Sequence, residues 1–336
     1  FLDTALASLK TGGLETAWFS GVDPDPVIQN VEDGVEAARL AHADMVIALG
    51  GGSAIDTAKA ISLMASNPGR LPDYEFGGAP GACLPIIAVP TTAGTGSEAT
   101  KGAVITDEER MVKMGINFPQ LMPRLALLDP ALTLSLPPTV TAATGFDALT
   151  HAIEALLVTI APPFSKPFAL EAIRLLCDNL PGVMADGADP EARANMLLGS
   201  YYAGCAISIA ATGLVHAMAR PLGVYFHVPH GLANAILLTR VMRFNAGAGA
   251  GPFVEMAPQF GVDTAGLAGP QLLDAVTDKI AALFALTGLP QTLREVGAEA
   301  SLLPRLAHDA AVNRSNQINI RVAREDEILE MYTQLY

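Results

Sequence analysis

Asp147 and His151 lie four residues apart in the apolar, proline-free stretch Gly145–Glu154. On a helix, side chains with this spacing project from the same face one turn apart. An Asp oxygen and an imidazole nitrogen placed in this way can hold one divalent metal ion. The pair alone does not decide for a metal, because a single histidine on an apolar helix is more often a hydrogen-bonded core residue.

Two further histidines, His216 and His230, lie in a second apolar, glycine-flanked segment. The chain has only six histidines, so the presence of His151, His216 and His230 in these two segments favours a shared purpose. One Asp and three His form a complete ligand set for Fe²⁺ or Zn²⁺, and the set suits both ions. The sequence therefore predicts a metal site formed by Asp147, His151, His216 and His230.

A glycine turn between an apolar strand and a helix is the next feature that could bind a ligand. The apolar run Asp44–Leu49 leads directly into Gly50-Gly-Gly-Ser-Ala-Ile-Asp-Thr-Ala-Lys59, and a helix is expected to continue to about Ser66. In this arrangement the backbone N–H groups at the helix N-terminus can cradle a phosphate or pyrophosphate. The run is not Gly-x-Gly-x-x-Gly, so it could also be a tight turn, with Asp56 and Lys59 as a solvated ion pair.

A second loop of the same kind favours the ligand-binding interpretation. The apolar strand Leu84–Val89 ends in the polar, glycine-spaced loop Pro90–Glu98. Open α/β sheets bind cofactors where loops leave the carboxyl ends of neighbouring strands. The two loops together predict a dinucleotide-binding α/β domain with a parallel, Rossmann-like sheet.

The remaining elements divide the chain into two halves. Helices at 2–10 and 27–42, a strand at 15–20, a strand pair at 100–107 and 112–116, and a strand at 125–128 are expected in the first half. Helical periodicity then replaces the strand signals, with helices expected near 139–160, 166–179, 190–220, 229–243, 252–260, 270–287, 290–297 and 323–335. We therefore predict an α/β domain over 1–134 and an all-α, metal-binding domain over 135–336.

Composition and charge limit the classes of partner. Charged residues are 16% and hydrophobic residues 51% of the 336. No apolar run approaches the ~20 residues of a membrane span. A net charge of −14 disfavours nucleic acid and acidic membranes. We expect small molecules or other protein chains as partners, including a homodimer or higher homo-oligomer. Three widely spaced cysteines suit free thiols in a reducing compartment, which predicts a cytoplasmic protein.

Four motifs in order along the chain resemble the signatures of the iron-containing (group III) alcohol dehydrogenases. They are Gly50-Gly-Gly-Ser-x-x-Asp-x-x-Lys59, Pro90-Thr-Thr-x-Gly-Thr-Gly-Ser-Glu98, Gly145-Phe-Asp-Ala-x-x-His-Ala-x-Glu154 and Leu214-Val-His-Ala-x-Ala followed by Pro-His-Gly-x-x-Asn234. The resemblance implies the two-domain architecture shared with dehydroquinate synthase. It also implies an NAD- or NADP-linked oxidoreductase that interconverts a small alcohol and its aldehyde or ketone by hydride transfer.

The resemblance also assigns the cofactor-binding residues. Gly51, Gly52 and Ser53 would contact the pyrophosphate, and Asp56 belongs to the same motif. Thr91 and Thr92 would lie on the adenosine side, and Ser97, Thr100 and Val104 on the nicotinamide side. Lys113 would bind a ribose hydroxyl, although a lysine beside a charged turn is commonly just exposed.

The chain departs from the family pattern at two places. Family members begin with about 40 further residues, which include the acidic residue that helps to distinguish NAD from NADP, so cofactor preference is not readable and we expect residues in front of Phe1. Arg220 stands where the family usually has a non-ligand histidine, four residues after His216. A guanidinium cannot exchange protons as an imidazole does. Arg220 could pair with a protein carboxylate or anchor an anionic substrate such as a semialdehyde acid, with His227 as a candidate proton relay.

Two other classes of protein compete with this interpretation. Dehydroquinate-synthase-like lyases share the layout, but their phosphorylated, carboxylated substrate needs several Lys and Arg beside the metal. The helical segments here offer little beyond Arg220. A binding or scaffold protein without activity would require both glycine loops and all four ligands to be incidental.

Overall fold

Three parallel strands form the sheet of the first part of the chain. They are β1 (Val46–Gly50), β2 (Ile86–Pro90) and β5 (Leu125–Ala126), in the order β1-β2-β5. In the register of β1 and β2, Gly50 lies opposite Pro90. The two glycine-containing loops therefore leave the sheet side by side at the same edge, as expected for a ligand-binding α/β sheet.

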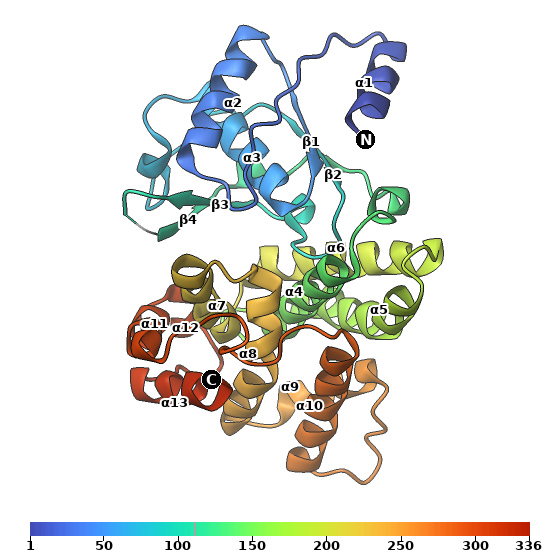
Figure 1. The fold of residues 1–336 in the computed structure, drawn as a ribbon, viewed down its shortest axis with the longest axis vertical. Coiled ribbons are helices and arrows are strands. Elements are labelled where there is room, and N and C mark those ends of the chain that lie inside the picture. Colours follow the sequence, from blue (N-terminus) through green and yellow to red (C-terminus); the bar gives the residue numbers. More distant parts are fainter. Residues whose placement is uncertain (111) are drawn as a thin grey trace. The chain divides into compact units, whose positions relative to one another are not determined.

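A computed structural model describes residues 1–110 and 112–336 (Figure 1). The chain divides into a first unit, Phe1–Thr92 with Ser97–Thr133, and a second unit, Ala93–Gly96 with Leu134–Tyr336. The first contains the sheet and the second is helical, which confirms the predicted fold class.

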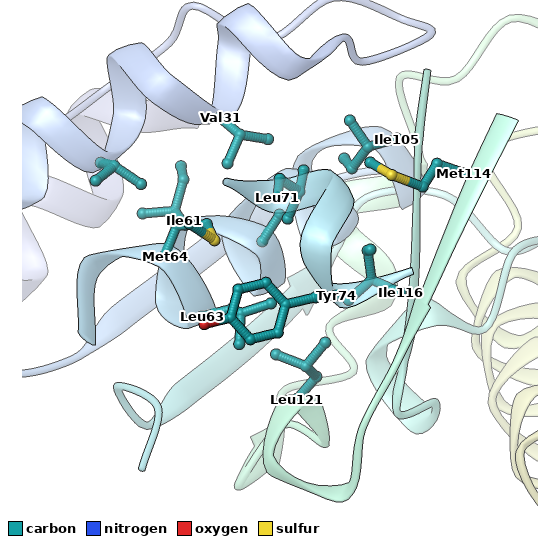
Figure 2. Packing of buried hydrophobic residues seen from close by; sticks show 12 residues of the cluster. Val31, Ile61, Leu63, Met64, Leu71, Tyr74, Ile105, Met114, Ile116 and Leu121 are labelled. Atoms are coloured by element: carbon teal, nitrogen blue, oxygen red, sulfur yellow. The ribbon is translucent and has the colours of Figure 1, made fainter. Parts of the chain in front are cut away.

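Helices and a hairpin enclose the apolar core of the first unit. Helix α3 (Gly52–Ser66) packs on the sheet, and α2 (Ile28–Leu40) packs on α3. The antiparallel hairpin of β3 (Gly102–Asp107) and β4 (Val112–Asn117) was expected from the sequence. Figure 2 shows buried side chains from these elements meeting, among them Val31, Ile61, Ile105 and Met114. This core fixes α3, whose first residues form the glycine turn.

The second unit is built on a cluster of long helices. Helix α4 (Pro138–Leu156) packs against α5 (Lys166–Ala185), α6 (Pro190–Ala210) and α8 (His230–Asn245). Helix α7 (Leu214–Phe226) packs on α8. The later helices of this unit are α9 (Gly251–Met256), α10 (Gly269–Leu286), α11 (Leu303–Ala311), α12 (Arg314–Gln317) and α13 (Glu325–Leu335). Helix α1 (Leu2–Thr11) belongs to the first unit. The centre of α4 is buried on all sides, so any polar group there must find a partner within the protein.

Three expected elements were wrong. Residues 15–20 form no strand, because no neighbouring strand pairs with them, and Trp18 is 60% exposed. Residues 290–297 form turns instead of a helix; Gly297 has a φ of +79°, and the Leu293 N–H donates to the Leu335 carbonyl. The single helix expected over 190–220 is two helices, α6 and α7, which meet at 105°.

In the described part of the chain, no single helix is long and apolar enough to cross a membrane. The bent pair α6 and α7 reaches the necessary length and apolarity there only when its two helices are counted together.

Candidate metal centre

The break between α6 and α7 brings the four predicted metal ligands together. Asp147 and His151 lie on the buried middle of α4. His216 lies in the first turn of α7, and His230 is the first residue of α8. A continuous helix through 190–220 would have carried His216 away on a straight axis, so the 105° bend is what directs this residue toward α4.

One carboxylate oxygen is the centre of this arrangement. Asp147 Oδ1 lies 3.8 Å from His151 Nε2, 3.9 Å from His216 Nε2 and 3.7 Å from His230 Nε2. The His151 and His216 rings are stacked with centroids 4.7 Å apart, and the His216 and His230 rings meet edge to face at 5.0 Å. All four ligand atoms thus converge, although they come from three different helices.

The protonation states of this cluster suit a cation. Burial and the neighbouring charges of His151 and His230 lower the pKa of His216 well below its ordinary value, so its imidazole is neutral. Burial opposes ionisation of Asp147, but the adjacent histidines and the Asn234 amide hold its pKa below the ordinary value. An anionic oxygen with imidazole nitrogens is the donor set that Fe²⁺ and Zn²⁺ accept.

The distances themselves argue for an ion between these groups. At 3.7–3.9 Å, Asp147 Oδ1 is too far from the imidazole nitrogens for hydrogen bonds, yet these atoms face one another in a buried place. A carboxylate oxygen and three imidazole nitrogens that converge at this separation form the donor set of a divalent ion, whose bonds to such atoms are about 2.0–2.2 Å long.

Glu154 holds His216 in position. Its Oε2 lies 2.6 Å from His216 Nδ1 and accepts from the Gly213 N–H, and its Oε1 accepts from the Val215 N–H. Since Nδ1 is engaged by the carboxylate, Nε2 is the nitrogen left for a metal. Burial raises the pKa of Glu154 to about 7. Gly213 permits this approach, because a Cβ there would lie 3.1 Å from Glu154 Oε1.

Glu154 and Asn234 stand within two of the family motifs, but no role was predicted for either residue from the sequence. Glu154 is seven residues after Asp147, two turns along the same helix face, which was the available signal. Asn234 is four residues after His230 and is completely buried. Its Nδ2 donates to Asp147 Oδ1 at 2.7 Å.

Arg220 and His227, the two predicted catalytic residues, are not part of the converging cluster. The Arg220 guanidinium donates to Asn313 Oδ1 at 3.0 Å and to Ser315 Oγ at 3.4 Å. Its hydrogen-bond partners are therefore neutral, whereas one of the two alternatives predicted a pairing with a protein carboxylate. The charge of Glu154 acts on the guanidinium and opposes the effect of burial on its pKa. His227 is exposed at the C-terminal cap of α7, in the left-handed conformation with a φ of +53°.

In the first unit, the turn after β1 has the properties of a phosphate cradle. Helix α3 begins at Gly52 with Gly51 as its N-cap, and no side chain caps its first N–H groups. Gly50 has a φ of +154°, a backbone angle that residues other than glycine rarely adopt. A Cβ on Gly51 would lie 3.2 Å from Thr92, so the two loops approach closely at this point. Free N–H groups and bare backbone are what a pyrophosphate requires.

Asp56 and Lys59 are not a solvated ion pair. The Lys59 ammonium is fully buried and donates to Ser97 O, Ser97 Oγ, Thr100 Oγ1 and Gly102 O at 2.7–3.0 Å. Burial lowers the pKa of Lys59 to about 8. Asp56 accepts from Ser97 Oγ at 2.5 Å and from the Val104 N–H at 2.9 Å. The two residues thus hold the segment that contains the three residues predicted for the nicotinamide side.

Other predicted cofactor residues have partners within the protein. Ser53 Oγ donates to the Pro24 carbonyl, and the Thr91 N–H donates to Gly50 O at 3.0 Å. Lys113 forms an ion pair with Asp25 at 2.6 Å. These contacts order the surface around the glycine turn. The contacts of these residues with a cofactor stay predictions.

Comparison with known proteins identifies the family. Residues 1–130 match the model of the family described as iron-containing alcohol dehydrogenase. Residues 141–336 match the model described as Fe-containing alcohol dehydrogenase family, C-terminal. The two matches follow one another without overlap and together cover nearly the whole chain.

Individual relatives give the same result. The chain is 39% identical over 338 residues to 1,3-propanediol dehydrogenase of Citrobacter freundii, covering 100% of this chain and 87% of the relative. It is 38% identical over 327 residues to lactaldehyde reductase of Escherichia coli K12, covering 96% and 85%. A solved structure of 1,3-propanediol oxidoreductase superposes with a TM-score of 0.97 at 37% identity, covering 100% of this chain and 88% of that one. The chain belongs to the iron-containing alcohol dehydrogenase family.

Proposed function

We propose that this alcohol dehydrogenase uses one divalent metal ion, held by Asp147, His151, His216 and His230, and a nicotinamide dinucleotide to interconvert a small uncharged alcohol and its aldehyde. The observation that carries the proposal is the approach of three imidazole nitrogens to one carboxylate oxygen at 3.7–3.9 Å. The family's activity as an alcohol and aldehyde oxidoreductase agrees with it.

The four ligands define what the helical unit contributes. A bound divalent ion would supply Lewis acidity, which favours the alkoxide of an alcohol and polarises the carbonyl of an aldehyde. Asp147 provides the negative charge that offsets part of the ion's charge, and Glu154 fixes the orientation of His216. His230 is the most accessible ligand, with a side chain 38% exposed, against 4–7% for Asp147, His151 and His216. We therefore place the substrate oxygen on the side of His230.

The first unit would bind the cofactor through the turn after β1 and the loop after β2. Gly51, Gly52 and Ser53 would present backbone N–H groups to the pyrophosphate. Thr91 and Thr92 follow β2 directly beside this turn. Ser97, Thr100 and Val104 would contact the nicotinamide side, while Asp56 and Lys59 would act by holding that segment rather than by contacting the cofactor.

The named relatives suggest the finer points. One relative, from Bacillus methanolicus, is named NAD-dependent methanol dehydrogenase and is 35% identical over 325 residues. We infer NAD as the cofactor on this support, with NADP as the alternative. A small diol or hydroxyaldehyde is the substrate class that the names of the propanediol and lactaldehyde enzymes suggest.

An anionic substrate anchored by Arg220 is less well supported. The guanidinium already donates to Asn313 and Ser315, so it has hydrogen-bond partners without a substrate carboxylate. His227 is exposed at the C-terminal end of α7, and its role as a proton relay stays a prediction.

Location and assembly are also inferred. Among the described residues the three cysteines, Cys83, Cys177 and Cys205, form no disulfide bond, which suits a reducing compartment such as the cytoplasm. A homodimer or higher homo-oligomer is the expected state, and light scattering after size-exclusion chromatography would measure it.

The test combines metal analysis with an activity assay. The purified protein should contain about one Fe²⁺ or Zn²⁺ per chain and should consume NADH or NADPH with a panel of short aldehydes. His230→Ala should keep the helical circular dichroism of the wild type, since this side chain is partly exposed, but should lose metal and turnover. Full turnover by the demetallated wild type would refute the metal site.

A further inference from the structure

Asn234 is the polar residue closest to the ligand atoms that the function described above does not use. It lies on α8, one turn after His230, and is completely buried. Its Nδ2 lies 2.7 Å from Asp147 Oδ1, 3.3 Å from His230 Nε2 and 3.4 Å from His216 Nε2. One amide nitrogen thus contacts three of the four proposed ligand atoms.

The chemistry of the contact fixes the orientation of the amide. A carboxylate only accepts hydrogen bonds, so the NH₂ group must face Asp147 Oδ1. The opposite orientation would place two oxygens 2.7 Å apart without a proton between them. The cost of the chosen orientation is that Asn234 Oδ1 is buried without a partner.

We propose that Asn234 is a positioning residue of the metal centre, whose amide hydrogen bond holds the Asp147 carboxylate beside the histidines. A carboxylate oxygen has two lone pairs, so Oδ1 can accept this N–H and still offer a lone pair to an ion. The inference rests on the proposed metal site.

Partners of metal-binding side chains commonly change metal affinity when they are replaced. Removing such a hydrogen bond typically costs 10–100-fold in affinity. Asn234 differs from Glu154, which contacts one histidine, because its amide contacts the one anionic ligand and two histidines. Its loss should therefore change both the affinity and the geometry of the site.

The experiment measures metal binding independently of activity. The variant Asn234→Leu has a side chain of similar size and no donor, and Asn234→Ala serves if Asn234→Leu does not fold. Demetallated protein is titrated with Zn²⁺ against a chelating dye, and with Co²⁺ while its visible absorption is recorded. We expect the Kd for Zn²⁺ to rise about 10–100-fold and the Co²⁺ spectrum to shift.

Asn316→Leu is the matched control. Asn316 is as buried as Asn234, but among the described residues its amide hydrogen-bonds to the backbone of Ala311 and Ala323. This variant should lose thermal stability while keeping the wild-type Kd and Co²⁺ spectrum. Wild-type Kd and spectrum in folded Asn234→Leu or Asn234→Ala would overturn the inference. A wild type that binds neither ion would instead overturn the metal site itself, so the two failures are distinguishable.

Discussion

At the scale of single residues, the structure separates groups that converge from groups that only share a motif. Asp147 and its three histidines meet at one point although up to 83 positions separate them in the chain. Arg220, four residues from His216, has its own partners in Asn313 and Ser315. Distance along the sequence was thus a poor guide to which polar residues act together.

Replacing Arg220 tests whether it serves the substrate or the fold. Because the guanidinium bonds to two neutral side chains, Arg220→Met should lower kcat/KM by the same factor for a semialdehyde acid and for an uncharged aldehyde of similar length. Steady-state kinetics on the two substrates measures this. A rise in KM of ~10²-fold for the acid alone would instead show an anion anchor, since that is the loss expected for a charge-assisted bond.

The buried carboxyl of Glu98 should make the free energy of unfolding depend on pH. Burial raises the pKa of its carboxyl to about 7, and no described residue forms a hydrogen bond with its Oε1. Between about pH 4.5 and 7 the folded protein therefore holds a proton that the unfolded chain releases, so Glu98 makes stability fall as pH rises through this window.

Glu98→Gln should remove this part of the pH dependence, because the amide does not titrate. Relative to the wild type, the variant should gain on the order of 3 kcal/mol between pH 4.5 and 7.5. Urea unfolding at several pH values measures the difference, and comparing the two proteins cancels the contribution of Glu154, which titrates in the same range. Parallel pH curves for the two proteins would contradict the assignment.

At the scale of elements, the two functional parts depend on where helices begin and end. The bend between α6 and α7 places His216, and the start of α8 places His230. In the first unit, the register of β1 and β2 brings the Gly50 and Pro90 ends together. Helix boundaries are the feature that periodicity predicts least well, because a break needs only one or two unusual backbone angles.

The glycine turn gives a prediction at this scale. A Cβ at Gly51 would lie 3.2 Å from Thr92 and would fill the space through which a phosphate approaches the first N–H groups of α3. Gly51→Val should raise the Kd for NADH at least ~10-fold, since it blocks anion binding at the helix N-terminus. Calorimetry measures the affinity. Metal content should stay at the wild-type level, and an unchanged NADH affinity would show that the pyrophosphate binds elsewhere.

At the scale of the whole molecule, the binding of metal should be visible as stability. A ligand that binds only the folded state stabilises it by RT ln(1 + [L]/Kd), about 2.7 kcal/mol at 100 times Kd. Removing the ion with a chelator should lower the thermal midpoint, and restoring Zn²⁺ should raise it again. His230→Ala, which lacks one ligand, should respond much less to added Zn²⁺. An equal response of the two proteins in calorimetry would place the stabilising ion outside the proposed site.

Much of the fold followed from local patterns in the sequence. The apolar runs before Gly50 and Pro90 predicted parallel strands, and the Ala- and Leu-rich periodicity of the second half predicted helices. The spacing of Asp147 and His151 placed both on one helix face without any tertiary information. These features are local, since they depend on residues a few positions apart.

What only the tertiary structure decided depends on contacts between distant segments. Residues 15–20 alternate like a strand but find no partner strand, and pairing is what makes a strand. Lys59 looked like a surface lysine, yet its ammonium is buried because four acceptors from 97–102 surround it. Asn234 and Glu154 gained roles only when α4, α7 and α8 came together, because the physical reason for each role is a hydrogen bond across helices that no local pattern encodes.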